Sequence, residues 1–109
     1  MLKMYGIKNC DTVKKAQKFL DLHGVEFEFI DFRQNPINAL TLQSFIDALG
    51  WDKVINKRST TYRNFTDDEK QNITPALALK NPTLIKRPVL VLDNEIRVGF
   101  SEKIYSDLI

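Results

Sequence analysis

One cysteine, Cys10, is the residue of this sequence best suited to chemistry. It follows a short apolar stretch and directly precedes a segment with helical periodicity, so it is predicted at the start of a helix. Backbone amides at a helix start have no partner within the helix, and together with the helix dipole they stabilise negative charge. Because the thiolate is the nucleophilic form of cysteine, this position predicts a reactive, exposed thiol. The alternative is a small buried apolar residue, the usual fate of a free cysteine.

A reactive thiol at this position needs a further charged partner. Lowering a thiol pKa from about 8.5 to about 7 requires roughly 2 kcal/mol. A helix terminus supplies only about 0.3–1 kcal/mol, so hydrogen bonds or a cation must supply the rest. Lys8 is adjacent in sequence, and Arg87 is the candidate that folding would bring alongside Cys10.

The remaining polar candidates each have a structural explanation as well as a functional one. Arg87-Pro88 directly precedes a strongly apolar segment, where proline is typical of strand entry. Arg58 and Arg63 flank a polar stretch and form either a solvated face or an anion site. His23 precedes a glycine and is interpreted as a favourable cation at a helix end, not as a catalytic base.

Composition indicates one globular domain over residues 1–109. Hydrophobic residues make up 43% and charged residues 28%, which excludes a disordered chain. A net charge of +2 is too small to predict direct nucleic-acid binding, and no apolar run approaches the ~18 residues of a membrane span. One Cys and one His exclude an internal disulfide and a Cys/His zinc site, so no metal is expected. The N-terminus lacks the pattern of a signal peptide, and with a lone thiol this favours the cytoplasm.

Periodicity predicts strands at both ends of the chain and helices between them. Residues 2–5 and 25–32 are predicted as parallel strands joined by a helix over about 11–23, which ends at Gly24. Residues 89–92 and 96–98 are predicted as a hairpin around Asp93-Asn94, and Ser101 begins a last helix. The order is βαβ, helical insertion, ββα, which indicates an α/β fold with a small mixed four-stranded sheet.

The predicted insertion covers about residues 36–84 and carries no strong strand signal. Thr41 is predicted to cap a helix that ends at Gly50, and a short helix is expected over 51–56. Thr66 and Glu69 have the spacing of a capping box, and Thr74-Pro75 is typical of a helix start.

Four segments of the sequence resemble motifs of one known family, and they occur in the same order as in that family. They are residues 5–16 (YGIKNCDTVKKA), 56–63 (NKRSTTYR), 84–88 (LIKRP) and 98–102 (VGFSE). The chain is similar to the ArsC-like family, which is related to glutaredoxin-type arsenate reductases, and most similar to its Spx/YffB branch. The resemblance implies a thioredoxin-like (glutaredoxin-like) core at about 1–35 and 85–109, with the insertion between its halves.

The same resemblance assigns roles to the candidate residues. It implies that Cys10 is the active thiol and that Pro88 follows a cis peptide facing it. It also implies that Arg87 lies near the thiol, where it binds an oxyanion or stabilises the thiolate. Two positions that carry arginine in the arsenate reductases are Asn56 and Gly99 here, which weakens the case for arsenate. Spx-type regulators often carry a second Cys where this chain has Val13.

We therefore expect a glutathione-dependent thiol reductase that uses Cys10 as nucleophile and Arg87 as its partner. An external thiol, glutathione, must complete the cycle because the chain has no second cysteine. The residues expected to bind substrate or glutathione are Lys8, Asn9, Arg58, Arg63 and Pro88. No bound cofactor is expected, and glutaredoxin is a further candidate partner. The alternatives are a glutaredoxin-dependent arsenate reductase and an Spx-like regulator that binds RNA polymerase without turnover.

Overall fold

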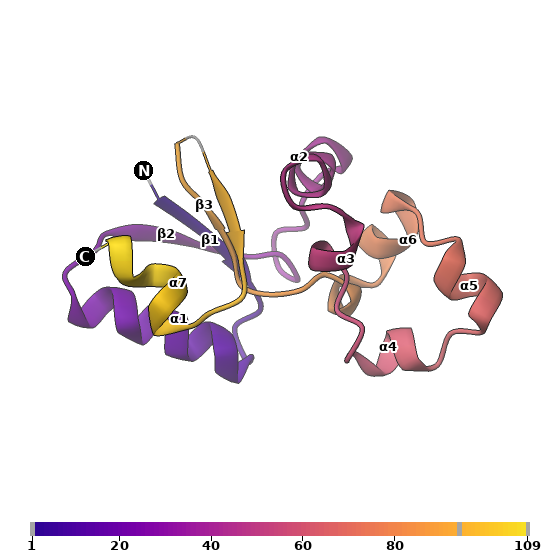
Figure 1. The fold of residues 1–109 in the computed structure, drawn as a ribbon, viewed down its shortest axis with the longest axis horizontal. Helices are drawn as coiled ribbons and strands as arrows, with labels where there is room; N and C mark the ends of the chain where they lie inside the picture. Colours follow the sequence, from indigo (N-terminus) through magenta and orange to yellow (C-terminus); the bar gives the residue numbers. More distant parts are fainter. Residues whose placement is uncertain (1, 94, 109) are drawn as a thin grey trace. The chain divides into compact units, whose positions relative to one another are not determined.

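The computed structural model describes residues 2–93 and 95–108. The chain divides into two compact units (Figure 1). The first contains the segment up to Asn35 and the segment from Arg87 on, and the second is Pro36–Lys86.

The first unit is built on a four-stranded mixed sheet. Its elements are β1 (Leu2–Gly6), α1 (Asp11–Leu22), β2 (Phe27–Asp31), β3 (Val89–Val91), β4 (Ile96–Val98), α7 (Glu102–Tyr105) and the 3₁₀ turn η2 (Ser106–Leu108). The strand order is β2-β1-β3-β4. β1 pairs with β2 in parallel, whereas the pairs β1–β3 and β3–β4 are antiparallel. The predicted parallel βαβ unit and the return hairpin are both confirmed.

The apolar face of α1 packs on this sheet. Val13, Ala16 and Leu20 are fully buried, as the spacing predicted, and they share a core with Met4 and Tyr105. Burial of a whole Leu side chain contributes about 1.5–3 kcal/mol, so this contact is a main source of stability for the unit.

Gly6 allows α1 to lie close to β1. A Cβ atom at this position would come within 2.8 Å of Val13 Cγ2. That separation is shorter than real Cβ atoms tolerate, so the position requires glycine for packing. The first turn of α1, which carries the thiol, is thereby held against the end of β1.

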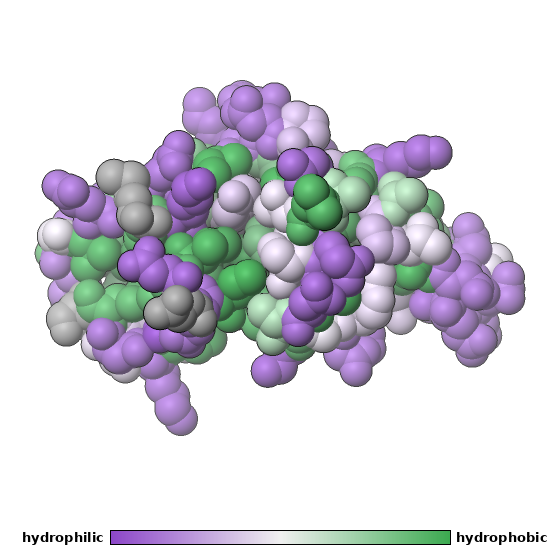
Figure 2. Space-filling view, turned by 90° about the horizontal axis from the view of Figure 1, so that it is seen from above, coloured by the Kyte–Doolittle hydropathy of each residue, from purple (hydrophilic) through white to green (hydrophobic). Residues whose placement is uncertain are grey.

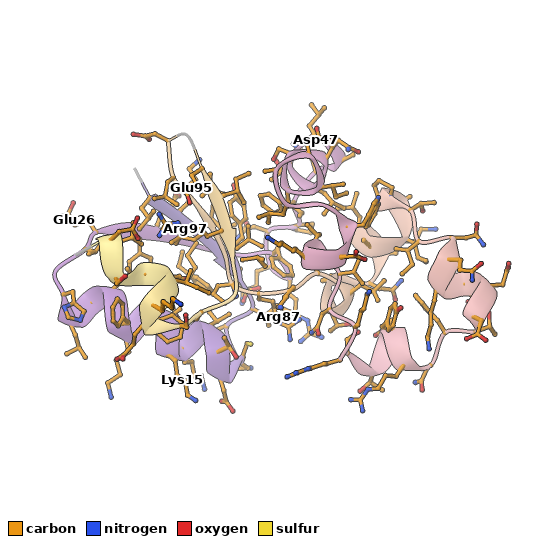
Figure 3. All side chains as sticks on the ribbon, in the orientation of Figure 1. Lys15, Glu26, Asp47, Arg87, Glu95 and Arg97 are labelled. Carbon is orange, nitrogen blue, oxygen red and sulfur yellow. The ribbon has the colours of Figure 1, made fainter. Side chains whose placement is uncertain are left out.

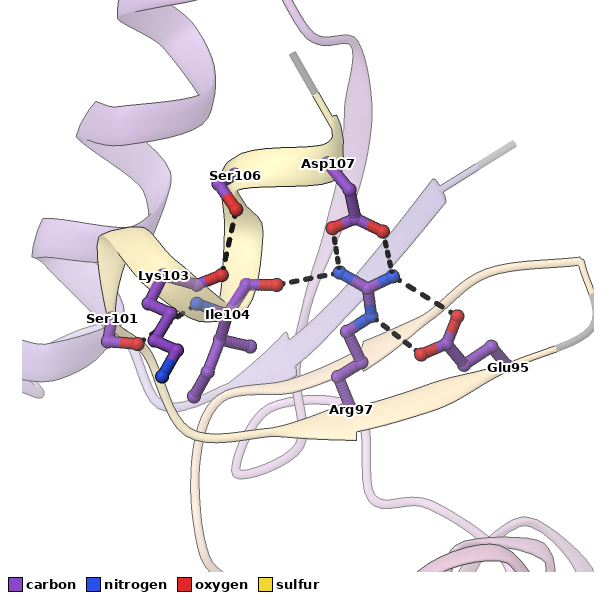
Figure 4. Close-up of polar contacts among 7 residues, drawn as sticks. All are labelled: Glu95, Arg97, Ser101, Lys103, Ile104, Ser106 and Asp107. Carbon is purple, nitrogen blue, oxygen red and sulfur yellow. Dashed lines mark hydrogen bonds and ion pairs between the residues drawn. The ribbon is translucent and has the colours of Figure 1, made fainter.

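Arg97 connects β4 to the C-terminal turn (Figure 4). Its Nη1 and Nη2 donate to Asp107 Oδ1 and Oδ2 at 2.6 and 2.7 Å, and its Nε donates to Glu95 Oε2 at 2.8 Å. Nη1 also donates to the Ile104 carbonyl at 2.7 Å. A planar guanidinium suits this two-sided pairing with carboxylates, so Arg97 fixes α7 and η2 beside the hairpin.

The second unit consists of short helices. They are α2 (Ala39–Leu49), α3 (Trp51–Val54), α4 (Thr60–Arg63), α5 (Asp67–Gln71), α6 (Pro75–Lys80) and the 3₁₀ turn η1 (Pro82–Leu84). A single antiparallel bridge joins Ile55 and Ile85. The capping box of Thr66 and Glu69 forms on both sides, and Thr74 caps α6 with Pro75 in its first turn, so both predictions are confirmed.

One prediction about a helix start is wrong, and one helix was not predicted. α2 is capped by Asn38, whose Oδ1 accepts from Thr41 N at 2.8 Å, and not by Thr41 itself. Asn is a stronger N-cap than Thr, and the helix therefore begins earlier than expected. The polar stretch around Tyr62 forms α4, because Ser59 Oγ accepts from Tyr62 N at 3.1 Å.

Several element ends differ from the expected ones by one or two residues. The second strand is Phe27–Asp31 instead of 25–32, and β3 ends at Val91. The helix α3 ends at Val54 and not at residue 56. Asn94 of the expected turn lies outside the described residues.

The arrangement βαβ followed by ββα on one mixed sheet is the α/β, thioredoxin-like fold that was predicted. No helix among the described residues is both long and apolar enough to span a membrane. Hydrophilic side chains cover much of the face in Figure 2, with apolar areas between them.

Candidate active site

Cys10 is the N-cap residue of α1. The loop from Ile7 leaves the end of β1 and closes as a turn in which Cys10 N donates to Ile7 O at 3.2 Å. The Cys10 carbonyl accepts the first helical hydrogen bond, from Lys14 N at 3.0 Å. The Cys10 side chain is half-buried, so the thiol is not sealed in the core. Cys10 thus lies between the two interpretations: it packs against the core of the first unit and keeps part of its surface exposed.

The surroundings of Cys10 favour its thiolate. Burial raises the pKa of the thiol, but the backbone N–H of Val13 and the Arg87 side chain lower it by more. Arg87 acts through a hydrogen bond and through its positive charge, and the N–H of Thr12 adds to the effect. The net result is that the pKa of the Cys10 thiol lies below its ordinary value. Hydrogen bonds and the charge of Arg87 therefore outweigh the effect of burial and favour the thiolate.

Arg87 reaches the thiol because of strand pairing. It comes just before β3, which lies antiparallel to β1 with Tyr5 opposite Val89. Continuing that register places position 87 level with the loop that leaves β1 and carries Cys10. Figure 3 shows Arg87 near the end of α1 at which the chain arrives from β1. The Arg87–Pro88 peptide bond is cis, as the resemblance implied, and Pro88 is buried.

Asp31 is a structural partner of the cysteine loop that the sequence reasoning did not identify. Asp31 is a buried residue, with 8% of its surface exposed. Oδ2 accepts from Lys8 N at 3.2 Å, and Oδ1 accepts from Arg33 N at 2.8 Å. A signal was present in the sequence, because an acidic residue follows the apolar strand residues just where the strand must end. Asp31 therefore ties the loop before Cys10 to the end of β2.

The other predicted binding residues are divided between the two units. Lys8 and Asn9 are exposed and lie in the turn before Cys10. Arg58 and Arg63 are exposed and lie in the second unit, where Arg63 is in the last turn of α4. Their part in substrate binding, like that of Pro88, stays a prediction.

Arg58 lies in a basic part of the second unit. It lines a cavity of about 320 Å³ together with Lys57, Lys86 and Asp52. Lys57 Nζ pairs with Asp52 Oδ1 at 3.4 Å, with both side chains largely exposed. Pairs of this kind contribute little to stability, so the cations remain available for anions.

The two departures from the arsenate reductase pattern have local structural roles. Gly99 has a φ of 83°, a conformation that a side chain would strain. The Asn56 side chain accepts from Arg58 N at 3.1 Å and stabilises the turn before α4. Among the described residues, no group of three or more His, Cys, Asp or Glu side chains is arranged to hold a metal ion.

The first unit combines a thioredoxin-like sheet with a half-buried thiol that lies at a helix start beside an arginine. These features place the protein among the members of this fold class that carry a thiol at the start of the first helix. The chain belongs to the ArsC family, whose family model matches residues 5–108. This finding confirms the resemblance drawn from the four sequence segments.

The similarity to related sequences and to solved structures covers nearly the whole chain. A protein of Haemophilus influenzae, named only as uncharacterized, is 44% identical over 109 residues, covering 96% of each chain. The global transcriptional regulator Spx of Enterococcus faecalis is 26% identical over 107 residues, covering 94% of this chain and 81% of its own.

Two solved structures have closely similar folds. The YffB protein superposes with a TM-score of 0.89 at 37% identity, covering 98% of this chain and 97% of its own. An arsenate reductase related protein from Brucella melitensis superposes with a TM-score of 0.79 at 36% identity, covering 97% and 92%. These neighbours support the YffB branch of the family.

Proposed function

We propose that this protein is a glutathione-dependent thiol reductase in which Cys10 is the nucleophile. The observation that carries the proposal is the contact between the Cys10 thiol and Arg87, at a helix start where backbone amides also favour the thiolate. Membership of a family that includes arsenate reductase related proteins supports it.

The reaction takes place in two exchange steps. The Cys10 thiolate attacks one sulfur of a disulfide, a new S–S bond forms to Cys10, and the other half leaves as a thiolate. A glutathione thiolate then attacks the mixed disulfide, which frees Cys10 and leaves an oxidised product that contains glutathione. Arg87 stabilises negative charge on Cys10 before the first step and after the second. The external thiol is required because the chain contains one cysteine.

The pH dependence of Cys10 alkylation by iodoacetamide tests the role of Arg87. We expect wild-type Cys10 to react faster at pH 6 than free cysteine does, because its pKa is lowered. Arg87→Ala should raise the pKa of Cys10 and move the profile to higher pH, with less thiolate and slower alkylation at pH 6. Arg33→Ala, which removes an exposed arginine of the same compact part of the chain, is the matched control and should leave the profile unchanged.

Glutathione dependence is tested separately by mass spectrometry. Incubation with glutathione disulfide should produce a Cys10 adduct of one glutathionyl group, which reduced glutathione then removes. A thiol that alkylates at pH 6 no faster than free cysteine, or that forms no adduct, contradicts the proposal.

A regulator without turnover is the second candidate function, and the similarity to Spx favours it. This candidate predicts that the protein retrieves RNA polymerase subunits and that Cys10→Ser leaves the capture unchanged. Retrieval that depends on Cys10, or none at all, argues against it.

Arsenate reduction is the third candidate, and the geometry supports it least. An arsenate dianion needs several charge-assisted donors, and positions 56 and 99 supply none. An assay of arsenate turnover with glutathione and glutaredoxin tests it directly.

A further inference from the structure

A cavity of about 350 Å³ lies in the first unit, next to the loop that carries Cys10. It is lined by Lys8, Gln17, Phe29, Asp31, Gln34 and Asn35. Its size is within the range of sites for small ligands. Neither the fold nor the chemistry of Cys10 accounts for it.

Asp31 holds the walls of this cavity in place. Its carboxylate bonds to the backbone of Lys8 and Arg33, and its carbonyl accepts from Gln34 N at 3.1 Å and Asn35 N at 2.8 Å. The segments before α1 and after β2 are thus fixed by one buried residue. A site that is formed before its ligand arrives loses less entropy on binding.

The lining groups match a short peptide that carries both charges. The Lys8 ammonium suits a carboxylate, and the Asp31 carboxylate has lone pairs that its two N–H donors leave for an ammonium group. Three side-chain amides, from Gln17, Gln34 and Asn35, can donate to peptide carbonyls and accept from peptide N–H groups. Phe29 supplies an apolar wall, and its partner in the sheet is Met4 of the core.

The cavity is within reach of the thiol. Lys8 and Cys10 are two residues apart, so their Cα atoms are separated by at most about 7 Å. Gln17 is on α1, the helix that Cys10 begins. An extended tripeptide spans about 10 Å, which is enough to connect the cavity to the cysteine sulfur.

We propose that this cavity binds the peptide part of the thiol that exchanges with Cys10, a small peptide with carboxylate and ammonium groups such as glutathione. The proposal rests on the proposed thiol-exchange function and adds a recognition site to it. Lys8 binds a carboxylate, Gln17 and Gln34 bind the peptide groups, and Asp31 binds the ammonium group. The cavity therefore favours disulfides that contain peptide groups over disulfides that carry the same charge but no peptide groups.

Three disulfides separate these contributions when the rate of mixed-disulfide formation at Cys10 is measured. Glutathione disulfide has amides and charges, 3,3′-dithiodipropionate has carboxylates without amides, and hydroxyethyl disulfide has neither. We expect the double variant Gln17→Ala/Gln34→Ala to react about five- to tenfold more slowly with glutathione disulfide only, the loss typical of one or two hydrogen bonds. Lys8→Ala should slow both anionic disulfides by about two- to fivefold and leave hydroxyethyl disulfide unchanged.

Lys15→Ala is the matched control for Lys8→Ala, because Lys15 is an exposed lysine of α1 (Figure 3) and is not among the residues that line the cavity. It should leave all three rates unchanged. The cavity proposal is overturned if the rates of the double variant are unchanged, or if they fall equally for all three disulfides. In either case, exchange by the wild-type protein would still support the proposed function. A wild-type Cys10 that reacts with none of the three overturns the proposed function and this inference with it.

A binding measurement tests the cavity without the reaction. In Cys10→Ser, reduced glutathione should shift the NMR signals of the Gln17, Gln34 and Asn35 side-chain amides. Shifts confined to other residues, or no shifts, overturn the proposal even if the exchange rates of the variants fall.

Discussion

The two compact units of this chain obtain their structure in different ways. The first joins segments far apart in sequence through a sheet and a shared core that includes Met4, Leu20 and Tyr105. The second contains helices of at most eleven residues, and several of them begin at a side-chain cap. Short helices are marginal in isolation, so local caps and tertiary packing must stabilise them.

This difference explains why the candidate chemistry lies in the first unit. Cys10 meets Arg87 only because β3 pairs with β1 across the intervening insertion. A local cap organises its own helix, whereas a sheet brings distant residues to one point. Substitutions that act on one kind of stabilisation and not on the other test the comparison.

The largest effect is expected from the core of the first unit. Leu20→Ala removes a side chain with no exposed surface and should lower the free energy of unfolding by about 2–5 kcal/mol. Leu22→Ala, on the same helix but 74% exposed, should change it by less than about 0.5 kcal/mol. Urea denaturation of both variants measures the difference. Equal losses of unfolding free energy in the two variants would contradict the assignment of Leu20 to the core.

The contact between β1 and α1 should be next in size. Gly6→Ala places a Cβ atom 2.8 Å from Val13 Cγ2 and should cost about 1–3 kcal/mol. Because Val13→Ala removes the clashing methyl groups, the same substitution should cost much less in that background. A double-mutant cycle by denaturation checks this, and additive losses would show that the clash is absent.

The caps of the second unit should contribute less individually. Asn38→Ala removes the acceptor for Thr41 N and should lower the free energy of unfolding by about 1 kcal/mol. Thr41→Ala keeps that acceptor and should change it by less than about 0.5 kcal/mol. Thermal denaturation measures both losses. A larger loss of stability in Thr41→Ala than in Asn38→Ala would instead support Thr41 as the cap, as predicted from the sequence.

The smallest effect should come from the ion pairs at the edge of the first unit. The Arg97 side chain lowers the pKa of Glu95 and of Asp107 below their ordinary values. A lowered folded-state pKa contributes stability above those values, and this stability is lost as the pH falls through the folded-state pKa. Arg97→Ala should raise both pKa values, which an NMR titration of the carboxyl carbons measures, and unchanged values would contradict the pairing.

Local signals in the sequence predicted much of both units. The spacing of Val13, Ala16 and Leu20 identified the buried face of α1, and the capping box at Thr66 located α5. Such signals depend on residues within one or two turns of each other. The Thr41 prediction was wrong because an asparagine three residues earlier is a better cap.

The candidate site could be predicted only in part. The position of Cys10 at a helix start follows from local sequence, whereas its contact with Arg87 depends on strand pairing and was supported by family resemblance. Asp31 was not identified because its role depends on a hydrogen bond to Lys8, in a loop distant in sequence. An acidic residue at the end of a strand has many common roles, and the surrounding amino-acid sequence does not distinguish between them.

The single tryptophan of the chain, Trp51, begins α3 and therefore belongs to the helical unit. Emission excited at the red edge of the aromatic absorption band consequently originates in that unit, while Tyr5 and Tyr105 are the chromophores of the other. Because the remaining tyrosine, Tyr62, also lies in the helical unit, only the tryptophan signal is specific to one unit, and optical melting of the intact protein can follow the helical unit by it without any added label.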